Sequence, residues 1–185
     1  TGSGIVPILL KAKTRGRHFT GLEIQHDSAD MARRSVEYNG LEEWIDIVEG
    51  DVCRTEEYFP AASFQAVTCN PPYRKAGSGE QSANEYVRTA RHETQLTAEE
   101  AIEAASALLR TGGKFYLVHL CERLDEIMSL CRAHTLMPKT LQLLRPAEGK
   151  PPSLFLLRCV KGGRSGLTVL PERTVYGTTA DDYPE

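Results

Sequence analysis

The sequence predicts an α/β protein with a mostly parallel, twisted sheet, helices on both of its faces and an antiparallel hairpin at the C-terminal end. Strand and helix patterns alternate along most of the chain, which is typical of parallel strands joined by crossover helices. Two strand patterns then follow one another, separated by RPAEGKPPS, whose Pro and Gly residues favour a hairpin loop. Because ligands of such sheets bind beyond the carboxyl ends of the strands, the informative residues are expected there.

The first half of the chain contains three strand patterns and one clear helix. The predicted strands are residues 19–25, 45–52 and 64–70. The helix is predicted over residues 27–39, where Asp27 can cap its start and Gly40 can end it. This order predicts successive parallel strands.

The second half begins with a helix and closes with the hairpin. Thr97 and Glu100 form a Thr-x-x-Glu box that starts the helix, and Gly112-Gly113 is expected to end it. A further helix is predicted where apolar residues fall at positions i, i+3, i+4 and i+7: Leu124, Ile127, Met128 and Cys131. The remaining strands are predicted at residues 114–120, 140–144 and 154–160. The last 20 or so residues are expected to form a loosely packed tail.

Length and composition fit one domain. The chain has 185 residues, 41% of them hydrophobic, and its apolar runs are too short to cross a bilayer. Its net charge of -3 argues against general nucleic-acid binding, so an RNA partner would need a local basic face. The five cysteines form no CxxC pair, which argues against a metal cluster or a disulfide framework and favours a cytoplasmic protein with reduced thiols.

The chain opens with TGSG followed by a helical pattern. A Gly-x-Gly turn normally follows a strand, and none precedes it here. We therefore expect residues 1–185 to be a single domain that lacks its N-terminal segment and its first, central strand. Gly2 and Gly4 would allow a ligand to approach the backbone closely. A dinucleotide site would usually have Gly or Ala at the position of Pro7, which disfavours NAD.

Two acidic residues mark the ends of the next two strand patterns. Glu23 lies 19 residues beyond Gly4 and is placed to accept the hydroxyls of a ribose. Asp51 is placed to bind the amino group of an adenine, with the backbone N–H of Val52 on a ring nitrogen, or else simply to cap a helix. The predicted cofactor-binding residues are Thr1, Gly2, Ser3, Gly4, Glu23, Ile24, Asp51, Val52 and Asn70.

An unusual stretch, Asn70-Pro71-Pro72-Tyr73, directly follows the third strand pattern. Together with TGSG, Glu23 and Asp51 it resembles the class I S-adenosylmethionine-dependent methyltransferases of Rossmann-like fold that methylate planar amines. The side-chain oxygen of Asn70 and the carbonyl of Pro71 can accept both hydrogens of such an amine and make its nitrogen more nucleophilic. The prolines hold that carbonyl rigidly, and Tyr73 offers a ring on which a base can stack. These four residues are the predicted catalytic set, with no metal ion.

The wider sequence resembles one family of these enzymes, the bacterial tRNA(1)(Val) (adenine-37-N(6))-methyltransferases and their Gram-positive relatives. The matching stretches are NPPYRKAGSG, ARHE, GGKFYLVH, ERL and KGGRSGLTVLPE. The resemblance implies a tRNA substrate that is methylated on an adenine N(6) amine. It also implies phosphate contacts from Arg74, Lys75, Arg91 and His92. Arg74 departs from the family, where an aromatic residue is common after the motif. His119 lies in an apolar strand pattern, where a structural histidine is commoner than a catalyst.

Three other functions fit parts of the pattern. The acceptors at Asn70 and Pro71 would serve the amide of a glutamine equally well, as in enzymes that methylate a release factor. A guanine in ribosomal RNA is a second alternative substrate. A binding module that keeps the fold and S-adenosylmethionine but lacks activity is the non-enzymatic alternative. An NAD enzyme is disfavoured, because the NPPY stretch has no role there. The sequence leaves the oligomeric state open.

Overall fold

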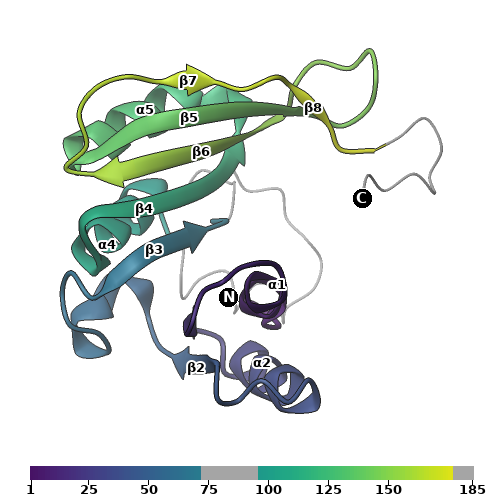
Figure 1. Cartoon of the computed structure of the whole chain (residues 1–185), viewed down its shortest axis with the longest axis vertical. Coiled ribbons are helices and arrows are strands. Elements are labelled where there is room, and N and C mark those ends of the chain that lie inside the picture. The colour runs from purple at the N-terminus through teal and green to yellow at the C-terminus, as the bar shows by residue number, and fades with distance from the viewer. Residues whose placement is uncertain (72–95, 177–185) are drawn as a thin grey trace, which may run out of the picture. The chain divides into compact units, whose positions relative to one another are not determined.

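The computed structural model describes residues 1–71 and 96–176 (Figure 1). The chain divides into two compact units, Thr1–Pro60 and Ala61–Glu185. Within the described residues, no helix is both long and apolar enough to cross a membrane.

The first unit is a pair of parallel strands with helices packed on them. Its elements are α1 (Ile5–Lys13), β1 (Phe19–Glu23), α2 (His26–Tyr38), β2 (Ile45–Glu49) and the 3-10 helix η1 (Val52–Glu57). The strand register runs from Phe19 opposite Ile45 to Glu23 opposite Glu49. Helix α2 buries small residues at helical spacing, namely Ala29, Ala32 and Val36. The register places the carboxyl ends of both strands side by side, at the edge where the sequence predicts the site.

The start of α2 differs from the prediction, whereas its end agrees with it. Asp27 does not cap the helix: the N-cap is Gln25, and Asp27 lies in the first turn, where its negative charge favours the helix. The backbone N–H of Gln25 donates to the carboxylate of Glu23 at 3.1 Å, which holds Gln25 extended and lets the helix begin one residue later. At the other end, Gly40 has a φ of 63°, and its N–H donates to the carbonyl of Glu37 at 2.9 Å, as in a Schellman ending.

The second unit is a mixed sheet. Its described elements are β3 (Phe64–Cys69), α4 (Ala98–Leu108), β4 (Leu109–Leu120), η2 (Cys121–Arg123), α5 (Leu124–Ala133), β5 (Leu136–Arg145), β6 (Leu154–Lys161), β7 (Thr168–Val169) and β8 (Arg173–Thr174). The strand order is β3-β4-β6-β5-β7, and β8 also pairs with β5. Strands β3 and β4 run parallel, and β5 and β6 form the predicted antiparallel hairpin.

The core of this unit lies between one face of the sheet and two helices. Helices α4 and α5 cover the same face (Figure 1) and pack on Phe115 of β4, Phe155 of β6 and Leu141 of β5. The predicted capping box is present: Thr97 Oγ1 accepts from the N–H of Glu100 at 3.2 Å, and the Glu100 carboxylate accepts from the N–H of Thr97 at 2.7 Å. The helix is therefore closed at its first turn, as the sequence predicts.

Gly112 and Gly113 do not end a helix. Helix α4 stops at Leu108, and both glycines belong to β4. Carbonyls at the end of α4 have another partner, because Lys161 Nζ donates to the carbonyl of Ser106 at 2.6 Å and to that of the C-cap residue Leu109 at 2.7 Å. Gly113 is required for a different reason: a Cβ there would lie 2.7 Å from the carbonyl oxygen of Arg110.

The prediction of a loose tail is also wrong for residues up to 176. Strands β7 and β8 both pair in parallel with β5. Side chains hold the segment as well: Gln142 Nε2 donates to the carbonyl of Pro171 at 3.1 Å, and Arg145 forms an ion pair with Glu172. Composition suggested a loop because Gly, Thr and Asp are frequent there, but the edge of β5 supplies backbone partners that composition does not reveal.

Candidate functional site

A glycine-containing turn precedes α1 in the first unit. Gly2 and Gly4 have φ angles of 58° and 86°, in the left-handed region that favours glycine. Gly4 is the N-cap of α1, and a Cβ there would lie 3.2 Å from the Cβ of Ala32 in α2. A third glycine allows the turn to approach the strand: a Cβ on Gly21 of β1 would lie 2.5 Å from the Thr1 side chain. The turn therefore lies close against both β1 and α2.

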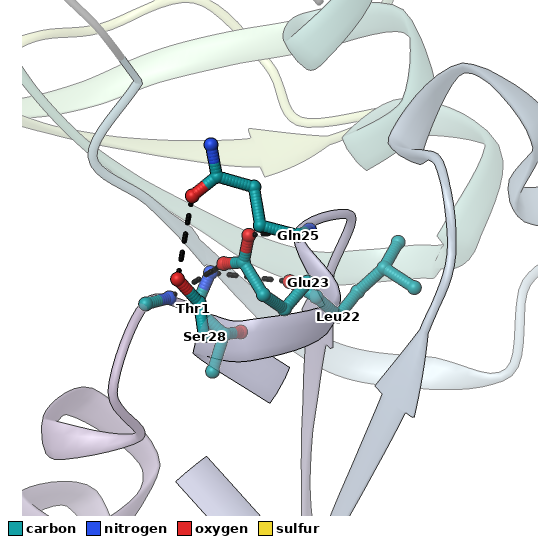
Figure 2. A network of polar contacts seen from close by, with 6 residues as sticks. Thr1, Leu22, Glu23, Gln25 and Ser28 are labelled. Atoms are coloured by element: carbon teal, nitrogen blue, oxygen red, sulfur yellow. Dashed lines mark hydrogen bonds and ion pairs between the residues drawn. The ribbon is translucent and has the colours of Figure 1, made fainter. Parts of the chain in front are cut away.

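Glu23, the last residue of β1, ties this turn to the strand. Its Oε2 accepts hydrogen bonds from the N–H of Gly2 at 2.7 Å and from the backbone nitrogen of Thr1 at 3.1 Å. Its Oε1 accepts from the N–H of Gln25 at 3.1 Å. Figure 2 shows the carboxylate at the centre of these contacts. The side chain is only 12% exposed, so the carboxylate is fixed in one position.

The electrostatics of this group favour the ionised form. Burial raises the pKa of Glu23, but the hydrogen bonds from Gln25, Gly2 and Thr1 together lower it by more, so the pKa lies below its usual value. Glu49, which lies opposite Glu23 in the strand register, has its own partners. Its carboxylate contacts His26 Nδ1 at 3.0 Å and accepts a hydrogen bond from Arg33. The hydrogen bond to His26 is the main cause of the lowered pKa of Glu49. Two carboxylates can therefore stay charged at neighbouring strand ends.

Asp51 lies just beyond the end of β2, beside the end of β1. The N–H of Gly50 donates to the backbone carbonyl of Glu23 at 2.9 Å, which joins the two strand ends. Asp51 is the N-cap of η1, and its Oδ1 accepts from the N–H of Cys53 at 2.9 Å. The capping role that the sequence left open is thus present. Only one carboxylate oxygen serves it, so the other remains chemically able to accept an amino group.

The first unit brings together most of the predicted cofactor-binding residues. Thr1 to Gly4, Glu23, Ile24, Asp51 and Val52 all belong to it. Ile24, which follows Glu23 directly, is an exposed apolar side chain at 40%. Such a set offers a charged acceptor, a close backbone approach and an apolar surface, which together suit a nucleoside.

The predicted catalytic residues belong to the second unit, and only two of them are described. Asn70 follows β3 directly and is exposed, and Pro71 is buried. Pro72 and Tyr73 lie outside the described residues, as do the predicted RNA-contacting residues Arg74, Lys75, Arg91 and His92.

His119 is a structural residue of the β4 core. It is fully buried, and its Nδ1 accepts from the N–H of Leu120 at 2.8 Å. Burial is the main cause of its lowered pKa. Among the described residues, no group of His, Cys, Asp and Glu side chains is arranged to hold a metal ion.

Two contributors to the site were not predicted from the sequence. Gly21 lies in the interior of a strand, which is a recognised sign of close backbone approach. Gln25 contributes its backbone N–H to Glu23, and its side-chain Oε1 accepts from Ser28 Oγ at 3.3 Å (Figure 2). Its only sequence signal was its position, two residues after Glu23.

Comparison with known proteins places these features in a family. Residues 1–128 match the family described as "Methyltransferase small domain". A relative from Porphyromonas gingivalis strain W83, named tRNA1(Val) (adenine(37)-N6)-methyltransferase, is 28% identical over 159 residues. That match covers 84% of this chain and 61% of the relative, so the chain spans about three-fifths of the length of that protein.

Two solved structures share the fold. A protein of Agrobacterium tumefaciens, described as a predicted O-methyltransferase, superposes with a TM-score of 0.76 at 24% identity, covering all of this chain and 81% of the other. The geranyl diphosphate C-methyltransferase of Streptomyces coelicolor A3(2), solved with S-adenosyl-L-homocysteine, gives a TM-score of 0.65 at 12% identity, covering 86% and 68%. The α/β, Rossmann-like fold class predicted from the sequence is thereby confirmed.

Proposed function

The chain belongs to the family of methyltransferase small domains, and we propose from this that it transfers a methyl group from S-adenosylmethionine to the N(6) amine of an adenine in tRNA. The observation that carries the proposal is the Glu23 carboxylate. It accepts a hydrogen bond from Gly2 of the Gly-x-Gly turn, its lowered pKa favours the ionised form, and both residues lie within residues 1–128, which match the family. The substrate rests on the relative from P. gingivalis, whose name specifies adenine-37 of a tRNA.

The residues of the first unit fit the adenosine part of S-adenosylmethionine. Glu23 accepts a ribose hydroxyl, the exposed side chain of Ile24 contacts the adenine ring, and Asp51 with the N–H of Val52 binds the ring edge. When bound, S-adenosylmethionine supplies an electrophilic methyl group. Gly2 and Gly4 leave room for the rest of the molecule to approach the backbone.

The residues after β3 act on the methyl acceptor. The exocyclic nitrogen of adenine is a poor nucleophile, because its lone pair is delocalised into the ring. The side-chain oxygen of Asn70 and the carbonyl of Pro71 accept its two hydrogens and return electron density to the nitrogen. The position directly after a strand suits this role, since the strand fixes both acceptors. Tyr73 stacks on the base, and Arg74, Lys75, Arg91 and His92 contact phosphates. The reaction would take place in the cytoplasm, where tRNA is found.

A methyl-transfer assay tests the proposal. The protein is incubated with methyl-labelled S-adenosylmethionine and, separately, with unmodified tRNA, ribosomal RNA and a release factor. We expect label in tRNA that is recovered as N(6)-methyladenosine after digestion. Label in the release factor would mean that Asn70 and Pro71 bind the amide of a glutamine. Label on guanine in ribosomal RNA would mean that guanine, and not adenine in tRNA, is the methyl acceptor. Binding of S-adenosylmethionine without transfer to any of the three would favour a non-catalytic module.

A further inference from the structure

The C-terminal part of the sheet is basic, although the whole chain has a net charge of -3. Residues 136–176, which contain β5 to β8, carry seven lysines and arginines and only two glutamates. Four of the seven cations have partners within the fold: Arg145 pairs with Glu172, Lys139 donates to the carbonyl of Arg164, Arg158 donates to Thr140, and Lys161 donates to carbonyls at the end of α4. The side chains of Lys150, Arg164 and Arg173 are exposed and bond to no residue that the structure describes.

The strand directions divide these three side chains between two ends of the sheet. Strands β3, β4 and β5 run the same way, because β6 is antiparallel to both β4 and β5. β8 runs parallel to β5, with Arg173 opposite Leu144 near the end of β5. Lys150 lies in the loop 146–153, directly after β5 (Figure 1). Arg173 and Lys150 therefore lie at the end of the sheet where Asn70 follows β3, whereas Arg164 follows β6 at the opposite end.

Tyr176 adds an aromatic residue at the same end as Lys150 and Arg173. Its N–H donates to the carbonyl of Pro146 at 2.9 Å, at the start of the loop 146–153, and the residue is 53% exposed. Glu172 is paired with Arg145, so Glu148 in this loop is the carboxylate that partly offsets the two cations. The end of the sheet beside Asn70 thus offers two exposed cations and an exposed ring.

The spacing of these residues suits an extended anion. Neighbouring strands lie about 4.8 Å apart, so β8, four steps from β3 in the strand order, is roughly 19 Å from the strand that precedes Asn70. A small anion cannot span that distance, whereas an RNA strand with its target base at Asn70 can extend along it. Lysine and arginine bind phosphates of any sequence, and an aromatic ring stacks on an unpaired base.

We propose that Lys150, Arg173 and Tyr176 form an RNA-docking surface next to the methyl-acceptor site. Lys150 and Arg173 bind phosphates of nucleotides that flank the target adenosine, and Tyr176 stacks on one of their bases. The inference rests on the proposed function, because it takes the substrate to be tRNA. These contacts position the RNA and do not touch the reacting atoms, so their loss should raise the KM for tRNA far more than it lowers kcat.

Binding of unmodified tRNA over a series of salt concentrations, with S-adenosylhomocysteine present, tests this surface. Lys150→Gln and Arg173→Gln each remove one charge, and Arg164→Gln removes the same charge at the opposite end of the sheet as the matched control. We expect each of the first two variants to raise the Kd for tRNA about twofold to fivefold and to reduce its salt dependence by about one phosphate contact. Arg164→Gln should match the wild type, and the Kd for S-adenosylhomocysteine should be the same in all variants.

Two variants of Tyr176 separate stacking from charge. Tyr176→Phe keeps the ring and should bind tRNA like the wild type. Tyr176→Ala removes the ring and should raise the Kd about fivefold or more, with the salt dependence unchanged.

The outcomes distinguish this inference from the proposed function. Equal losses in Arg164→Gln and Arg173→Gln would mean that overall charge attracts the RNA, and unchanged affinity in both Lys150→Gln and Arg173→Gln would mean that the RNA binds elsewhere. Either result overturns the docking surface, while methylation of tRNA by the wild type would still support the proposed function. A wild-type protein that methylates the release factor and does not bind tRNA would contradict both.

Discussion

The backbone N–H of Gly2 donates a 2.7 Å hydrogen bond to the carboxylate of Glu23. This contact helps to join the turn before α1 to the end of β1; Gly2 and Glu23 are 21 residues apart in the sequence. The same carboxylate is the proposed ligand of the ribose. Cofactor affinity and the local stability of the turn therefore depend on one side chain.

Glu23→Gln should weaken both properties. The substitution keeps the size of the side chain but removes its charge and replaces one acceptor oxygen by a donor. Hydrogen bonds to charged groups contribute about 1.5–3 kcal/mol, so we expect roughly a tenfold to hundredfold rise in the Kd for S-adenosylhomocysteine together with a lower Tm. Titration and thermal denaturation measure the two effects. Glu43→Gln, at an exposed residue of the same unit, should change neither. Unaltered affinity in Glu23→Gln would show that the ribose is held elsewhere.

The two glycines of the turn should differ in their tolerance of alanine. Both need a left-handed backbone, which costs a side-chain-bearing residue about 1–2 kcal/mol. A Cβ added to Gly2 would enter open space, whereas a Cβ on Gly4 would lie 3.2–3.4 Å from three atoms of Ala32. Gly4→Ala should therefore lower the free energy of unfolding more than Gly2→Ala does. Urea denaturation of both variants measures this. Equal losses of unfolding free energy would mean that Ala32 shifts to accommodate the added methyl group at no cost in stability.

Cofactor binding should persist at acidic pH and then fail at a pH set by Glu23. A carboxylate whose pKa is lowered in the folded protein contributes stability that is present above its unfolded pKa and lost as the pH falls through the folded value. We expect the affinity for S-adenosylhomocysteine to decline only below the ordinary titration range of a glutamate. Titrations over a pH series measure this. If affinity already falls within the ordinary glutamate range, the hydrogen bonds from Gly2 and Gln25 do not stabilise the charge.

Asn70→Ala should separate catalysis from cofactor binding. Removing one group that stabilises the transition state by hydrogen bonding typically costs roughly 10²–10³ in kcat. Because Asn70 is proposed to contact the methyl acceptor, the Kd for S-adenosylhomocysteine should change far less than kcat. Gln65→Ala, at an exposed position earlier on β3, is the control and should retain activity. Near wild-type turnover in Asn70→Ala would show that Asn70 is not the hydrogen-bond acceptor for the target amine.

Local signals in the sequence predicted most element types correctly. The Thr97–Glu100 box and the ending at Gly40 are short-range patterns, and each forms the hydrogen bonds that its sequence predicts. The predictions that failed in the second unit concern distant partners. Lys161 satisfies the end of α4 from a strand more than 50 residues away, and β5 supplies an edge for the C-terminal strands. No window of local sequence contains those contacts.

The site shows the same division. The position of Glu23 at a strand end followed from the alternation of elements, and the structure places it there. Its hydrogen-bond partners could not be predicted from the sequence, because every residue except proline has a backbone N–H, and residue type does not show which N–H, such as that of Gly2, donates to Glu23. Gln25 was overlooked because a glutamine after a strand has many uses.

Titration of the protein with S-adenosylhomocysteine, with NAD titrated in parallel, tests the proposed cofactor site most directly. We predict saturable one-to-one binding of S-adenosylhomocysteine, which Glu23→Gln weakens, and no comparable binding of NAD. Absence of binding by the wild type, or a preference for NAD, would contradict the assignment of this site to S-adenosylmethionine.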